Sequence, residues 1–156
     1  MSTNLILGCA TIAASLAVQC AVVAILLRVL IRLERKGIIR PTFAGISSLL
    51  MLVLIIILAG NLLQMTLWAG LFVLCGEFHD FPVAFYHSAV NFTTLGYGDV
   101  VMSQGKRLLG ALEAANGVMM FGLTTSLLYT VLSALVRRAW ESRTSQKVAS
   151  AEAPAC

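Results

Sequence analysis

Three long stretches of the chain are almost free of charge. Residues 2–27 and 41–76 carry no charged side chain, and residues 108–136 carry one, Glu113. A helix that crosses a bilayer needs roughly 20 apolar residues, and each stretch is longer than that. We therefore predict three membrane-spanning helices, over residues 4–35, 43–75 and 106–138.

The residues between the second and third stretches break this pattern. A short polar and aromatic loop follows Gly76, and Pro82 suits the first turn of a new helix, where its missing N–H costs nothing. This helix, predicted over 82–93, is too short to span a bilayer. The segment after it reads Thr-Thr-Leu-Gly-Tyr-Gly-Asp over 93–99. Its two glycines permit backbone conformations that other residues avoid, so the segment is not regular helix.

Basic residues cluster after the first and the third stretch. The clusters contain Arg28, Arg32, Arg35, Lys36 and Arg40, then Arg137, Arg138, Arg143 and Lys147. Lys and Arg mark the cytoplasmic side, so the N-terminus is predicted outside and the C-terminus in the cytoplasm, in a plasma membrane such as the bacterial inner membrane. The first stretch has no basic residue before it, which favours a retained helix over a removable signal peptide; an interfacial helix is the alternative.

Composition supports a membrane protein. Of the 156 residues 59% are apolar and 12% charged, against about 25% charged in a soluble domain. The net charge of +4 does not indicate nucleic acid, because the basic residues follow the predicted topology; they also predict contacts with anionic lipid. The four cysteines have no CxxC spacing, so neither a zinc site nor a disulfide framework is predicted.

The segment 82–99 lies between two spanning helices whose near ends are on the same side of the membrane. It must therefore enter the membrane and return. Irregular backbone at membrane depth is tolerated only where protein buries it or where it lines a water-filled path, which points to a pore. We divide the chain into residues 1–40 (first helix and basic linker), 41–138 (pore domain) and 139–156 (a disordered tail).

Residues 93–99 resemble the signature filter of potassium channels. The resemblance extends over 43–138: residues 43–75 look like the outer helix, 82–93 like the pore helix, 94–99 like the filter and 106–138 like the inner helix. It implies the prokaryotic potassium channel pore-domain family with an additional N-terminal helix. The implied fold is an all-α membrane protein with three transmembrane helices, a re-entrant pore helix and a filter loop, assembled as a homotetramer.

The resemblance also implies roles for the filter residues Thr93, Thr94, Leu95, Gly96, Tyr97, Gly98 and Asp99. Backbone carbonyls of Thr94 to Tyr97 would hold K⁺, and the Thr94 hydroxyl would complete the innermost site. Gly96 and Gly98 would allow an alternating backbone, and Tyr97 would brace the filter. Leu95 stands where valine or isoleucine is commoner.

Four further residues are predicted to support the filter. Tyr86 is expected to brace it and to hydrogen-bond near Asp99. Val90 occupies the place where some relatives have a glutamate that pairs with the filter aspartate. Glu113 is an acid inside a predicted span and so a functional candidate; a supporting hydrogen bond to Asn91 or Asn116 is favoured over ion coordination.

The third spanning helix has one face suited to line an inner cavity and gate. Its residues are Val118, Phe121, Thr125, Leu128 and Leu132. The alternative is that this stripe packs on other helices. By the resemblance to potassium channels, Gly117 lies at the hinge-like position of the inner helix. Gly122 follows Phe121, as in simple bacterial channels.

The function predicted is passive, selective permeation of K⁺. No cofactor is expected besides the permeant ion, and no nucleophile–base pair, metal cluster or phosphate loop indicates an enzyme. Two alternatives stay open: a non-conducting membrane scaffold or regulatory subunit, and a weakly selective cation channel. An intact Gly96-Tyr97-Gly98 weighs against the second of these.

Overall fold

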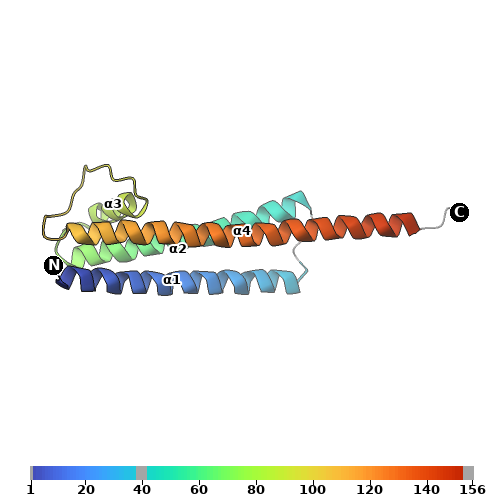
Figure 1. The fold of residues 1–156 in the computed structure, drawn as a ribbon, viewed down its shortest axis with the longest axis horizontal. Coiled ribbons are helices and arrows are strands. Elements are labelled where there is room, and N and C mark those ends of the chain that lie inside the picture. Colours follow the sequence, from blue (N-terminus) through green and yellow to red (C-terminus); the bar gives the residue numbers. More distant parts are fainter. Residues whose placement is uncertain (1, 38–41, 153–156) are drawn as a thin grey trace.

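The structure is a computed structural model that describes residues 2–37 and 42–152, and it contains four helices in that part of the chain (Figure 1). They are α1 (Ser2–Arg35), α2 (Phe43–Leu74), α3 (Phe81–Phe92) and α4 (Arg107–Glu152). The segments Ser2–Arg35, Ala44–Leu74 and Arg107–Arg137 are long and apolar enough to cross a membrane. The predicted all-α fold with three spanning helices is confirmed.

The long helices α1, α2 and α4 lie side by side, and the short helix α3 lies at the end where the filter loop emerges (Figure 1). Thr42 begins α2, with its hydroxyl accepting a hydrogen bond from the Gly45 N–H at 3.3 Å. Gly76, with φ +67°, reverses the chain after α2, as a residue without Cβ can. The turn brings α3 back against α2 and α4.

The first helix contacts both α2 and α4. Its buried positions recur every three or four residues: Gly8, Thr11, Ser15, Gln19, Val22 and Leu26. Most of this stripe is small or polar, which allows close approach of helices inside a membrane. A Cβ on Gly60 of α2 would lie 2.8 Å from a methyl group of Val22. The additional helix is therefore a full member of the bundle.

Two apolar clusters fill the bundle. The cluster beside α3 contains Trp68, Phe72, Phe92, Leu109 and Met120 among others. The cluster at the opposite end joins α1, α2 and α4 through Leu26, Leu49, Val53, Val131 and Leu135 among others. The first cluster fixes α3, and with it the start of the filter.

The predicted helix bounds are accurate to two residues except at one end. The tail predicted as disordered from residue 139 is helical to Glu152. Its sequence explains this, because it is rich in Ala, Arg, Lys, Glu and Gln, which favour helix, and its first proline is residue 154. Residues 38–41 of the predicted linker and 153–156 of the predicted tail lie outside the described residues.

Candidate functional site

The filter segment has a backbone of alternating handedness. Thr94, Gly96 and Gly98 have φ of 61°, 59° and 77°, while Leu95 and Tyr97 between them do not have positive φ. Thr94 is the one non-glycine residue with positive φ among residues 2–37 and 42–152. Such alternation directs successive N–H groups to one side of the strand, and successive carbonyls therefore to the other.

The N–H side of this strand faces the end of α3. The Thr94 N–H donates to the Asn91 carbonyl at 2.9 Å. The N–H groups of Leu95 and Gly96 both donate to the Val90 carbonyl, at 3.0 and 3.4 Å. Two of the last carbonyls of α3 thus accept from the first three amides of the filter segment. What Val90 contributes is this carbonyl, which any residue supplies, so the missing glutamate does not leave the filter unanchored.

The Thr93 side chain bonds to the end of α3 and not to the filter segment that follows. Its hydroxyl donates to the Ala89 carbonyl at 2.7 Å and lies 3.3 Å from that of Val90. Threonine often bonds back to the preceding turn in this way. Its side chain therefore closes α3 rather than facing outward with the filter.

The outer end of the filter is held by two bridges from α3. The Tyr86 hydroxyl donates to Asp99 Oδ2 at 2.7 Å, which is the contact predicted for this pair. His87 Nδ1 lies 3.0 Å from the Val100 carbonyl, and Asn91 Nδ2 lies 2.8 Å from His87 Nε2. The His87 bridge was not predicted. A cavity of about 400 Å³ lies behind the filter, and His87, Asn91 and Gly110 are among the residues that line it.

The Tyr86–Asp99 bond gives a testable acid dependence. It raises the pKa of Tyr86 and lowers the pKa of Asp99. A carboxyl whose pKa is lowered by folding stabilises the folded state at pH values above its ordinary pKa. That stabilisation is lost as the pH falls through the lowered pKa of the folded state. In Tyr86→Phe, we expect the Asp99 pKa to rise, as measured by NMR titration of its carboxyl carbon. Tyr129→Phe, far from the filter, is the control, and an unchanged Asp99 titration in Tyr86→Phe would contradict the assignment.

Helix α4 meets α3 at three points, each one turn after the last. Glu113 Oε1 lies 2.5 Å from the Ser88 hydroxyl. A Cβ on Gly117 would lie 1.9 Å from the Phe92 carbonyl oxygen, so glycine is required for this close approach. The Phe121 ring, one turn further, meets the Phe92 ring edge-on, with centroids 5.7 Å apart. These contacts place one face of α4 against the pore helix.

Glu113 has two side-chain partners on α3: Ser88, which was not predicted, and Asn91, which was. Asn116 is fully buried, and its amide has no hydrogen-bond partner among the described residues, so it does not bond Glu113. Gly117 lies in unbroken helix, as does Gly122, and their hinge role stays a prediction.

The predicted cavity face is divided in the structure. Val118, Phe121, Thr125 and Leu132 are exposed on the single chain, and the Thr125 hydroxyl donates to the Phe121 carbonyl at 2.8 Å. Leu128 instead is half-buried against the α1–α2–α4 cluster, because it lies three residues before Val131 on the face that meets those helices. For Leu128 the structure thus gives the packing alternative.

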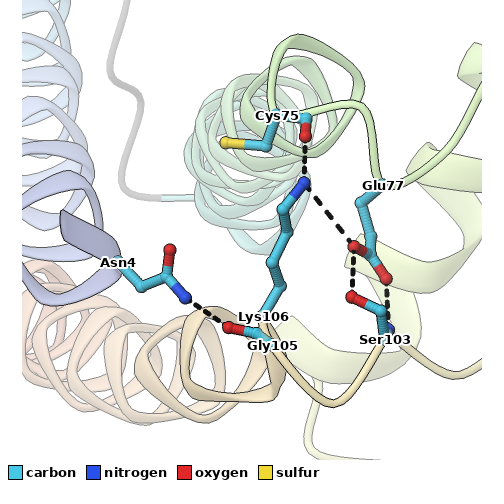
Figure 2. A network of polar contacts seen from close by, with 6 residues as sticks. All are labelled: Asn4, Cys75, Glu77, Ser103, Gly105 and Lys106. Carbon is cyan, nitrogen blue, oxygen red and sulfur yellow. Dashed lines mark hydrogen bonds and ion pairs between the residues drawn. The ribbon is translucent and has the colours of Figure 1, made fainter. Parts of the chain in front are cut away.

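A polar network fastens the loop after the filter (Figure 2). The Lys106 ammonium donates to the Cys75 carbonyl and lies 3.8 Å from Glu77 Oε2. Glu77 also accepts from the Ser103 backbone N–H and from its hydroxyl, the latter at 2.9 Å. Asn4 of α1 donates to the Gly105 carbonyl at 2.5 Å. The network joins the ends of α1, α2 and α4 beside the filter.

Comparison with known proteins identifies the family. A family model described as ion channel matches residues 50–134, more than half of the 156 residues, and the chain belongs to this family. The match covers most of α2, all of α3, the filter and α4 as far as residue 134, and α1 lies outside it. The chain is thus a multi-pass membrane protein with an ion channel domain and an additional N-terminal helix. A comparison with curated proteins finds no match, and neither does one with solved structures.

Proposed function

We propose that this chain is one subunit of a potassium-selective channel through which K⁺ permeates passively. The observation that carries the proposal is the backbone of the filter segment, in which the N–H groups and the carbonyls lie on opposite sides. The amides of residues 94–96 are bound to α3, and alternating φ signs over 94–98 leave the carbonyls of Thr94, Leu95, Gly96 and Tyr97 on the free side. Rings of such carbonyls replace the hydration shell of K⁺.

A single chain supplies only one wall of such a path. In the single chain Leu95 is 59% and Tyr97 68% exposed, although both belong to a segment that needs protein or a water-filled path around it at membrane depth. Further copies around a closed symmetry axis satisfy this requirement. We propose a homotetramer, since a filter of this type is built from four loops.

The proposed orientation follows the basic residues. Arg28, Arg32, Arg35 and Lys36 lie at the end of α1 and in the turn after it. Arg137 lies at the same end of the bundle, because it closely follows Leu135 of α4, which shares a cluster with Leu26 of α1. The side chain of Arg138 is not among those that the structure describes. With this end in the cytoplasm, these residues meet anionic headgroups, and the filter opens to the outside of a plasma membrane, the bacterial inner membrane in a bacterial source.

The test is ion flux through the purified oligomer. In liposomes with a potassium gradient we expect flux that favours K⁺ over Na⁺ by at least about tenfold, because the carbonyl ring suits the larger ion. Empty liposomes, and liposomes with the protein heat-unfolded before reconstitution, are the controls. Absence of flux from folded tetramers would indicate a scaffold or regulatory subunit, and equal Na⁺ flux a weakly selective channel. Either result overturns the proposal.

A further inference from the structure

The Ser88 hydroxyl lies between two oxygen atoms of neighbouring helices. Its Oγ is 2.9 Å from the Met65 carbonyl oxygen of α2 and 2.5 Å from Glu113 Oε1 of α4. Both separations are hydrogen-bond distances. A serine hydroxyl, however, carries one proton and donates one hydrogen bond. Two oxygen–oxygen contacts therefore need a second proton.

Of the three groups only the Glu113 carboxyl can bring that proton. The Met65 carbonyl is an acceptor only, whereas a protonated carboxyl has one O–H to donate. We infer that Glu113 is a neutral acid whose O–H donates to the Ser88 oxygen, while Ser88 donates to the Met65 carbonyl. A carboxylate in the same place would compete with Met65 for the single serine proton and leave one close oxygen pair without a hydrogen between them.

The surroundings of Glu113 are consistent with a neutral group. The residue is fully buried within the spanning part of α4. Among the residues that the structure describes, no basic side chain forms an ion pair with it. Besides Ser88, the Asn91 amide, itself a neutral group, bonds the carboxyl, and Oε2 has no partner with good hydrogen-bond geometry in the described part of the chain. An isolated carboxylate in such a place costs far more than a protonated acid.

With the proton on Glu113, a continuous chain of hydrogen bonds crosses the bundle. The chain of bonds runs from Glu113 on α4 through Ser88 on α3 to Met65 on α2. The next residue toward the start of α2, Gln64, donates to Gln19 Oε1 of α1 at 2.9 Å. Ser88 lies two residues before Val90, whose carbonyl anchors the filter amides. Glu113 is thus a positioning residue for the filter, and this part of the inference rests on the proposed function.

Infrared spectroscopy tests the protonation state without any need for ion conduction. The C=O stretch of a carboxylic acid is separate from the carboxylate bands, and isotope-labelled glutamate identifies it. In lipid at neutral pH, the difference between wild type and Glu113→Gln should show loss of an acid band, and Ser88→Ala should shift that band. Glu77→Gln, which removes a glutamate beside Lys106, is the control and should remove only carboxylate bands. Loss of carboxylate bands alone in Glu113→Gln overturns the inference.

Selectivity measurements test the positioning role. Glu113→Gln keeps a neutral group with an N–H for Ser88, so its K⁺/Na⁺ permeability ratio should stay within about twofold of wild type. Glu113→Leu removes the donor and should lower the ratio by about tenfold, as should Ser88→Ala, which removes both bonds at little change in volume. Because Glu113→Leu can fail to assemble, Ser88→Ala decides the matter. A wild-type ratio in assembled Ser88→Ala overturns the positioning role, whereas a wild type without K⁺ flux contradicts the proposed function and leaves the infrared result standing.

Discussion

Gly96→Ala is expected to abolish potassium selectivity while the oligomer still assembles. Position 96 has φ +59°, and a Cβ there would meet nothing within 4 Å in the chain. The penalty is therefore conformational, about 1–2 kcal/mol for an L-residue in the left-handed region, and it recurs in every subunit. The amides of Leu95 and of residue 96 are bound to Val90, so the strand relieves this strain by rotating the following peptide units, whose carbonyls would face the ion.

The measurement is the K⁺/Na⁺ permeability ratio in liposomes, with the assembly state followed by size-exclusion chromatography. Gly105→Ala is the matched control, because its Cβ also meets nothing within 4 Å and its φ is not positive. We expect the control to keep the wild-type ratio. An unaltered potassium preference in assembled Gly96→Ala would show that residues 94–97 do not form the selective path.

Gly117→Ala is expected to destabilise the protein and disturb the filter together. The added Cβ would lie 1.9 Å from the carbonyl oxygen of Phe92 and 2.8 Å from its carbonyl carbon. These are backbone atoms, which have no rotamer with which to move aside. The helices α3 and α4 must separate instead, and overpacking of this kind costs about 1–3 kcal/mol or more. The separation also displaces the carbonyls on which the filter amides rest.

The readouts are the thermal midpoint of the oligomer in detergent and the permeability ratio in liposomes. Gly122→Ala is the control on the same helix, because a Cβ there meets nothing within 4 Å and alanine favours helix over glycine. It should be at least as stable as wild type. If Gly117→Ala matched it in stability and altered only channel opening, Gly117 would be a hinge and not a site of close packing.

The spanning helices and the irregular segment after the short helix could be predicted because each rests on a local property. Charge-free length is enough to identify a spanning helix, and Pro82 with the two glycines after the short helix marks where regular structure begins and ends. The Tyr86–Asp99 contact was also predictable once the resemblance had placed both residues beside the filter.

The contacts between helices could not be predicted in the same way. Ser88 is an ordinary serine in the sequence, and its importance arises only because Met65 and Glu113 meet it from helices 23 and 25 residues away in the chain. Gly117 has the same character, since a close approach depends on where α3 comes to lie. The stripe of α1 from Thr11 to Gln19 is too polar to suggest a partner by hydrophobic pattern, yet it is buried against both neighbours.

The tail differs from its prediction for another reason. Small and polar residues predict disorder, but the same residues suit a solvent-exposed helix. Nothing between the membrane-spanning part and Glu152 interrupts the helix, because the first residue that would do so is Pro154. Polarity alone therefore distinguishes membrane from water, and not helix from coil.

The length of α4 has a mechanical consequence. Its 46 residues extend about 69 Å, more than twice the roughly 30 Å of a bilayer's hydrocarbon core, and its far end projects beyond the other helices (Figure 1). Val131 and Leu135 hold α4 against α1 and α2, so the free arm is the part after Leu135, about 26 Å long to Glu152. A force on this arm acts first on the cluster that joins the three long helices, and reaches the contact between Gly117 and Phe92 through it.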